Sequence, residues 1–124
     1  LKAGKHVMLE KPAARTYRDA AKLAAIAGAS DKMAMVGMCM RFWPGWTWLK
    51  EAVDSGRYGA VKAAQFRRVA SHPGGPFYSD GLQCGGAVMD LHIHDTDFIQ
   101  YVFGMPTSVT SVGYSKITTE PDHE

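Results

Sequence analysis

Two clusters of ionisable residues in this chain could carry out acid–base chemistry. Glu10, Lys11 and Pro12 directly follow a short apolar run at residues 7–9, and residues 90–97 contain three aspartates and two histidines. In open α/β sheets, ligands bind at the carboxyl ends of the strands, so the first cluster is expected to face a ligand. Pro12 fixes its own φ and biases Lys11 towards an extended conformation, which directs the lysine. The second cluster supplies the acid–base partners that such a lysine would need.

The aspartates and histidines of the second cluster fit an α-helix. At about 100° per residue, Asp90, His94 and Asp97 fall within a sector of roughly 60°. Asp90 and His94 are four positions apart and can touch, and a carboxylate beside an imidazole favours its protonated form and orients the ring. A histidine tuned in this way can act as a general base near neutral pH. The alternative is a surface Asp–His pair without a function.

Two further residues of this helix have other expected roles. Asp95 lies in the apolar stripe, so it is expected to be buried with a partner, for which Arg41 is one candidate, in a structural role. His92 points almost opposite to Asp90, so the two histidines cannot both face one site. On a strand, His92 and His94 would share a face and could bind one metal ion, but the helical pattern favours a site without metal.

The elements that position these clusters can be read from the hydrophobic pattern. Thr16 followed by Asp19 predicts the start of a helix. Apolar runs of strand length lie before and after this helix, at residues 7–9 and 33–40, so a strand–helix–strand unit with a right-handed crossover is predicted. The helix has an alanine-rich stripe that suits close packing on a sheet, formed by Ala20, Leu23, Ala24 and Ala27.

The pattern changes at residues 41–45, which are a candidate domain boundary because Pro44 and Gly45 interrupt it. A short helix with Trp46, Leu49 and Val53 on one side is predicted next. The further elements expected are a strand at residues 61–71, a long site-lining loop at 72–86, a helix from Gly85-Gly86 to about residue 103 that Gly104 stops, and a final strand at 108–114.

The composition excludes several classes of function. A chain of 124 residues can form one core, and 46% apolar with 21% charged residues is typical of a soluble globular protein. A net charge of +2 gives no basis for nucleic-acid binding, and no apolar stretch is long enough for a membrane span. Lys62, Arg67 and Arg68 are interpreted as a solvated strand face. Cys39 and Cys84 match no metal or redox spacing, so reduced thiols and a cytoplasmic location are expected.

These motifs together resemble a known family. Glu10-Lys11-Pro12 after a short strand, the break at residues 41–44, and Gly85-Gly86 leading into Asp90 and residues 93–97 are similar to the Gfo/Idh/MocA oxidoreductases, which include glucose–fructose oxidoreductase and inositol dehydrogenase. The resemblance implies an α/β fold (α+β overall). Residues 1–43 would be the end of a Rossmann-type parallel sheet, and residues 44–124 the start of an open antiparallel-sheet substrate domain with a long helix.

The resemblance also implies an activity and a site. Family members bind NAD or NADP and transfer hydride between the nicotinamide and a sugar, cyclitol or related polyol. Lys11, Asp90 and His94 would be catalytic: His94 would take the proton from the substrate hydroxyl, Lys11 would hold nicotinamide and substrate in register, and Asp90 would orient His94 or bind a hydroxyl. The residues expected to bind the cofactor are Glu10, Lys11, Pro12 and Arg41. Candidate sugar-stacking aromatics are Trp43, Trp46 and Tyr78, with core packing as the alternative for the two tryptophans.

The chain departs from the family pattern because its sequence contains no G-x-G-x-x-G phosphate-binding loop. We therefore expect a fragment that lacks the first part of the Rossmann domain and the end of the substrate domain, and that neither binds dinucleotide nor turns over by itself. Unpaired strand edges predict a homo-oligomer. The alternatives are a metal-dependent hydrolase that uses His92 and His94, and a non-catalytic association module. The sequence does not predict which polyol is the substrate, or the choice between NAD and NADP.

Overall fold

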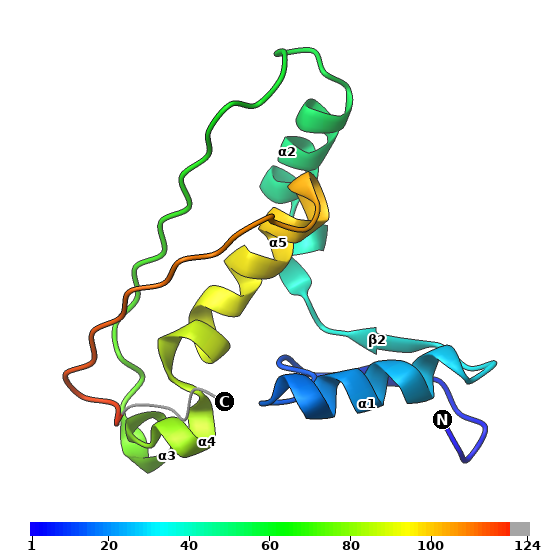
Figure 1. Cartoon of the computed structure of the whole chain (residues 1–124), viewed down its shortest axis with the longest axis vertical. Coiled ribbons are helices and arrows are strands. Elements are labelled where there is room, and N and C mark those ends of the chain that lie inside the picture. The colour runs from blue at the N-terminus through cyan, green and yellow to red at the C-terminus, as the bar shows by residue number, and fades with distance from the viewer. Residues whose placement is uncertain (120–124) are drawn as a thin grey trace.

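The computed structural model describes residues 1–119 and begins with a strand–helix–strand unit (Figure 1). The strands β1 (Val7–Leu9) and β2 (Ala34–Val36) are parallel, and Val7 pairs with Ala34 at the start of the register. The helix α1 (Tyr17–Gly28) connects them. The predicted unit is confirmed, with a second strand shorter than its apolar run.

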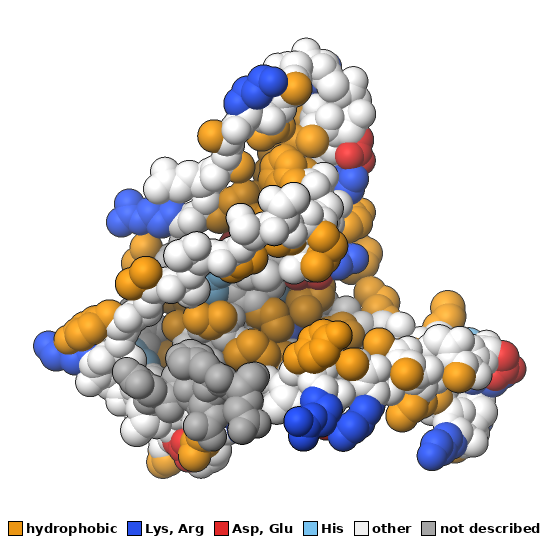
Figure 2. Space-filling view, viewed as in Figure 1, with side chains coloured by type: hydrophobic (Ala, Val, Ile, Leu, Met, Phe, Trp, Pro, Cys, Tyr) orange, Lys and Arg blue, Asp and Glu red, His pale blue; other side chains and the backbone are white. Residues whose placement is uncertain are grey.

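The helix α1 begins where the sequence indicates but is not buried. Thr16 caps it, because its hydroxyl oxygen accepts a hydrogen bond from the Asp19 N–H at 3.1 Å. No residue of α1 is buried, and Leu23 in the expected apolar stripe is 38% exposed. The prediction of a stripe seated on a sheet is therefore wrong for the described residues, because two strands of three residues offer too little surface to cover it. Figure 2 shows hydrophobic side chains along α1 on the outer face.

The small core lies where three helical elements meet beyond β2. They are the 3₁₀ helix η1 (Cys39–Phe42), the helix α2 (Pro44–Asp54) and the helix α5 (Ile93–Phe103). Phe98 of α5 is 0% exposed, and its ring lies 4.8 Å from that of Trp46 in an edge-to-face arrangement. Trp46 is half-buried and packs on this core, which favours the core-packing alternative for it. The other buried apolar side chains are Met40, Ala52 and Cys84.

Two long segments remain without regular structure. Residues 61–71 and 108–114 were expected to be strands, but neither forms one, so no antiparallel sheet is present among residues 1–119. Their composition suits strands, yet a strand requires a neighbour that completes its hydrogen-bond ladder. Figure 1 shows both segments as extended coils. Beyond the ends of both segments, the Thr118 hydroxyl donates to the carbonyl oxygen of Tyr78 at 2.7 Å.

The predicted loop at residues 72–86 contains two short helices, α3 (Gly75–Ser79) and α4 (Gly81–Cys84). Asp80 caps α4, because its carboxylate accepts from the Leu82 N–H at 2.9 Å. A π-helix, η2 (Val88–His92), follows and leads directly into α5, which Gly104 ends with a φ of 81°. The predicted helix end at residue 103 is confirmed. Within residues 1–119, no helix is both long and apolar enough to span a membrane.

Candidate active site

The carboxyl ends of the two parallel strands form one wall of an open hollow. Glu10 and Lys11 directly follow β1, and Gly37 follows β2 and donates its N–H to the carbonyl oxygen of Leu9 at 2.8 Å. This hydrogen bond holds the two strand ends together at the hollow. The hollow is lined by Glu10, Lys11, Met35, Gly37, Trp43 and His94, among others.

Lys11 connects this strand edge to the π-helix. Its Nζ donates to Asp90 Oδ1 at 2.9 Å and also to the backbone carbonyl oxygen of Asp90. The ion pair is mostly shielded from water, since the side chains of Lys11 and Asp90 are 19% and 33% exposed. The structure thus brings together two expected site residues that are 79 positions apart in the sequence.

His94 lies at the same hollow but does not pair with Asp90 as expected. Within residues 1–119, the Asp90 carboxylate binds Lys11, and His94 Nδ1 is buried without a hydrogen-bond partner. The expectation assumed an α-helix, whereas Asp90 lies in a π-turn, in which hydrogen bonds run from i to i+5 and side chains four apart no longer align.

The environment of His94 favours its neutral form, contrary to the expectation of an imidazolium stabilised by a carboxylate. Burial is the main cause that lowers the pKa of His94, and the positive charges of Lys11 and Arg68 lower it further. Asp95 and Asp90 oppose this effect without reversing it. A neutral imidazole at neutral pH can accept a proton, so His94 has the protonation state that a general base requires.

Asp95 is buried with an arginine, as predicted, but its partner is Arg68. Arg68 Nε donates to Asp95 Oδ2 at 2.6 Å and Arg68 Nη2 to Asp95 Oδ1 at 2.8 Å. Arg68 was placed on a solvated face and Arg41 was the suggested partner, so both of those expectations are wrong. The hydrogen bonds from Arg68 lower the pKa of the Asp95 carboxyl although its burial acts in the opposite direction. The pair holds the extended segment at residues 61–71 against α5.

Arg41 binds Asp97 instead. Its Nε and Nη2 donate to the two carboxylate oxygens of Asp97 at 2.8 and 2.5 Å, and the guanidinium lies 4.6 Å from the centre of the Tyr101 ring. Arg41 therefore joins η1 to α5, and it does not line the hollow at the strand ends. Pro12, whose peptide bond with Lys11 is cis, does not line it either. Of the expected cofactor-binding residues, Glu10 and Lys11 face the hollow.

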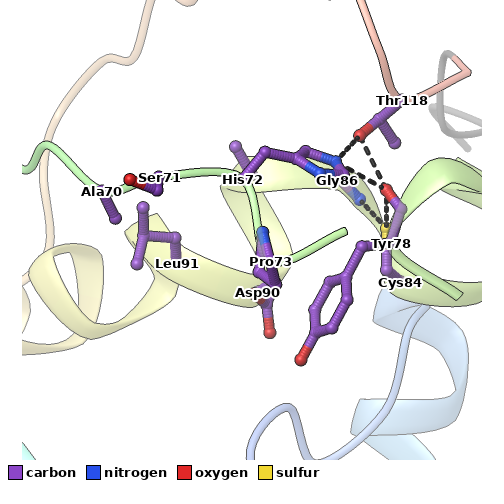
Figure 3. A pocket seen from close by; sticks show the side chains of 11 residues that line it. Ala70, Ser71, His72, Pro73, Tyr78, Cys84, Gly86, Asp90, Leu91 and Thr118 are labelled. Atoms are coloured by element: carbon purple, nitrogen blue, oxygen red, sulfur yellow. Dashed lines mark hydrogen bonds between the residues drawn. The ribbon is translucent and has the colours of Figure 1, made fainter. Parts of the chain in front are cut away.

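A second pocket lies on the other side of Asp90 (Figure 3). Tyr78, Pro73 and Leu91 give it an apolar lining, and Asp90 forms part of its wall. In Figure 3 the Tyr78 ring and the Asp90 carboxyl project to the same side. Asp90 thus connects a pocket with a half-buried aromatic ring, Tyr78, to Lys11 in the hollow.

The metal-site alternative finds no support in the described part of the chain. His92 is exposed and its Nδ1 lies 3.4 Å from the Thr96 hydroxyl, whereas His94 faces the hollow. No three His, Cys, Asp or Glu side chains of residues 1–119 are grouped so that they could hold a metal ion. A hydrolase based on His92 and His94 is therefore not supported, because the two rings do not converge.

Sequence reasoning missed Arg68 and the π-turn. Arg68 and Asp95 are 27 positions apart, and no local pattern connects them. The π-turn had an indirect signal in Gly85-Gly86, which was interpreted only as the start of an α-helix. Cys39 also borders the hollow, although its spacing from Cys84 gave no reason to place it there.

Comparisons with known proteins identify the family of this chain. Residues 46–124 match the model of the GFO/IDH/MocA C-terminal domain, and residues 1–38 match that of an oxidoreductase family with an NAD-binding Rossmann fold. The D-glucoside 3-dehydrogenase of Escherichia coli K12 is 36% identical over 97% of this chain and 36% of its own length. The trans-1,2-dihydrobenzene-1,2-diol dehydrogenase of Mus musculus is 31% identical over 91% of this chain and 34% of its own length.

The myo-inositol 2-dehydrogenase of Thermotoga maritima is 32% identical over 83% of this chain and 30% of its own length. The chain thus spans about a third of the length of these three relatives. No solved structure matches the chain significantly.

Proposed function

Because the chain belongs to the GFO/IDH/MocA oxidoreductase family, we propose that it forms part of an NAD(P)-dependent dehydrogenase acting on a sugar, cyclitol or related polyol. One observation carries this proposal above the others. Lys11 at the end of a parallel strand, paired with Asp90, lies at the same hollow as a histidine whose environment keeps it neutral. The names of the three relatives support a substrate with hydroxyl groups.

The residues present fit the nicotinamide end of a dinucleotide. The hollow opens at the carboxyl edge of the parallel strands, where ligands of open α/β sheets bind. Glu10 and Lys11 would hold that end, whereas the sequence contains no glycine-rich loop for the pyrophosphate. When bound, the nicotinamide would accept the hydride from the substrate carbon.

Side chains of this chain would accept the proton of the substrate hydroxyl and stabilise the negative charge on its oxygen. His94 would accept the proton of the substrate hydroxyl, because burial and two nearby cations keep its ring neutral. The ammonium of Lys11 would stabilise the negative charge that develops on the same oxygen. Asp90 would fix Lys11 in position, which replaces its expected role of orienting His94, since its carboxylate contacts Lys11.

We further propose which residues meet the rest of the substrate and where the domains divide. Tyr78, in the pocket beside Asp90, and Trp43, which is 49% exposed at the hollow, are two aromatic rings that a sugar could contact. A division at residues 43 and 44 is supported by the two family matches, which end at residue 38 and begin at residue 46. Exposed large apolar side chains such as Val112, which is 96% exposed, support association with a second copy.

The test of the catalytic assignment needs a pyrophosphate-binding segment. We would join a strand–loop–helix unit with a G-x-G-x-x-G loop ahead of Leu1 and assay oxidation of a polyol panel with NAD⁺ and NADP⁺. Lys11→Ala and His94→Ala are each expected to lower turnover by at least about a hundredfold, since a positioned acid or base contributes 10²–10⁴. The unmodified chain is expected to bind no NAD(H) in calorimetry, because it lacks that loop.

Two substitutions serve as matched controls. His92→Ala changes an exposed histidine of the neighbouring turn, and Lys2→Ala changes an exposed lysine. Both should leave turnover near the unsubstituted level. The site assignment is wrong if Lys11→Ala and His94→Ala retain turnover on an active substrate, or if His92→Ala lowers it as much as His94→Ala.

A further inference from the structure

Gly85 is packed so closely against the π-helix that no other residue fits in its place. It is buried and ends α4 in the left-handed conformation, with a φ of 73°. A Cβ built on it would lie 2.6 Å from Met89 Cβ and 2.8 Å from Met89 Cγ, distances that real Cβ atoms do not show. Gly85 therefore meets two independent requirements, a positive φ and the absence of a side chain.

The second requirement concerns the turn that carries Asp90. Met89 belongs to η2 and directly precedes Asp90. Lys11 donates to two acceptors of Asp90, the backbone carbonyl oxygen and a carboxylate oxygen. These two oxygens face one ammonium group only for a particular backbone conformation at Asp90, so the Lys11 contacts depend on the geometry of the π-turn.

We propose that Gly85 is a positioning residue: because it has no side chain, the π-turn at Met89 can close onto it, and in that closed position both Asp90 oxygens face Lys11. Any Cβ at residue 85 would push Met89 outward by about 0.8 Å to restore an ordinary contact of 3.4 Å. Because Met89 and Asp90 are consecutive, that displacement reaches the Lys11 contacts. The link to catalysis rests on the proposed function, whereas the packing and the ion pair do not.

The chain offers a matched control in Gly104. It also ends a helix with a positive φ, of 81°, but a Cβ there would meet nothing within 4 Å. Alanine at residue 104 introduces at least as much backbone strain as at residue 85, because Gly104 has a ψ of −171° in a region that essentially only glycine adopts, whereas Gly85 is in the αL region. Only the substitution at residue 85 adds a collision with Met89. A difference between the two alanine variants isolates the close contact from the strain.

The test measures the reactivity of the Lys11 amine in the folded chain. The protein is treated with limiting acetic anhydride, and acetylation at each lysine is quantified by mass spectrometry with exposed Lys2 as the internal reference. Gly85→Ala is expected to raise Lys11 acetylation about tenfold, the effect of losing a charge-assisted hydrogen bond, and Asp90→Asn should do the same. Gly104→Ala should leave Lys11 as protected as in the unsubstituted chain.

A second substitution that restores Lys11 protection distinguishes a positioning role of Gly85 from a general effect on folding. The double variant Gly85→Ala/Met89→Gly removes both atoms that the new Cβ would meet. It is expected to return Lys11 to its protected state, even if Gly85→Ala alone does not fold. The proposal is overturned if Gly85→Ala leaves Lys11 protected, if Gly104→Ala exposes Lys11 equally, or if the double variant fails to restore protection.

The acetylation result is separate from the dehydrogenase assay. If Lys11 protection behaves as described and no polyol is oxidised, the proposed function fails and the role of Gly85 stands. If polyols are oxidised in a manner that depends on Lys11 and His94, and Gly85→Ala leaves the amine protected, the role of Gly85 fails alone. Where both hold, Gly85→Ala should lower kcat by about a hundredfold, the effect of misplacing a catalytic group by roughly 1 Å.

Discussion

Replacing Arg68 by methionine should destabilise the chain because it leaves the buried carboxylate of Asp95 without its ion-pair partner. Asp95 is 2% exposed and receives two hydrogen bonds from the Arg68 guanidinium, at 2.6 and 2.8 Å. Methionine retains part of the apolar contact of the arginine stem and removes the charge and the donors. Asp95 would then have to remain charged without a partner, become protonated or turn towards water, and each of these costs free energy.

The size of the effect follows from the burial of the pair. Breaking a buried ion pair by removing one partner costs about 3–5 kcal/mol. The Arg68 side chain is 22% exposed, so water already reaches part of the guanidinium and the lower end of that range applies. We therefore expect the free energy of unfolding to fall by about 3 kcal/mol, a large part of the 5–15 kcal/mol typical of a folded domain.

The assay is urea unfolding followed by tryptophan fluorescence, since Trp46 contacts the buried Phe98 ring. Arg67→Met is the matched control: Arg67 is exposed, and within residues 1–119 it forms no ion pair. It should change the free energy of unfolding by less than about 0.5 kcal/mol. Asp95→Asn combined with Arg68→Met should recover part of the loss, because no charge is then left unpaired.

The difference between the unsubstituted chain and Arg68→Met should depend on pH. The Arg68 hydrogen bonds lower the pKa of Asp95 in the folded state. The pair therefore stabilises the fold fully above the pKa of an unfolded aspartate, about 3.9, and this contribution is lost as the pH falls through the lower folded value. The reasoning is refuted if Arg68→Met costs no more than Arg67→Met at pH 7, or if the difference between them persists unchanged in acid.

Two further predictions concern Arg41 and His94. Arg41→Gln should lower the free energy of unfolding by only about 1 kcal/mol, as measured by urea unfolding, because the Arg41 side chain is 37% exposed and solvent screens its pair with Asp97; a loss as large as that of Arg68→Met would contradict this. By NMR titration, His94 should have a pKa below the ordinary histidine value, and Lys11→Met should raise it. Because this pKa is lowered by folding, stability should decrease as the pH falls through about 6.5, the unfolded value, and a folded pKa at or above 6.5 would exclude the inferred environment.

The parts of the fold that could be predicted are those with a local cause. The strand–helix–strand unit follows from two apolar runs around a helix that Thr16 caps, and the end of α5 follows from Gly104 with its positive φ. The meeting of Lys11 with the aspartate–histidine helix was implied by the family resemblance, and no spacing in the sequence showed it. Local sequence patterns thus predicted single helices and strands, whereas the family resemblance predicted that Lys11 lies near the helix of Asp90 and His94.

The parts that could not be predicted depend on distant partners. Composition identified residues 61–71 and 108–114 as strands, but neither has a neighbouring strand among residues 1–119. Periodicity indicated that Asp95 needs a partner and Arg41 was suggested, whereas the partner is Arg68, which is distant in sequence. Helical spacing also predicted an Asp90 contact with His94, which the π-turn prevents. In each case the local pattern indicates that a residue or segment needs a partner, and tertiary packing determines which partner it has.

The three aspartates of the helix show how one element can serve both stability and chemistry. Asp95, Asp97 and Asp90 each bind a cation from a different segment of the chain, and their side chains are 3%, 13% and 33% exposed. A carboxylate closed off from solvent cannot exchange its partner for a ligand without exposing a charge. Asp90 is the most exposed of the three and lines the second pocket, so its pair with Lys11 is the one that we propose a substrate hydroxyl enters. The other two pairs hold the helix in place, since Asp95 binds Arg68 of the extended segment and Asp97 binds Arg41 of η1.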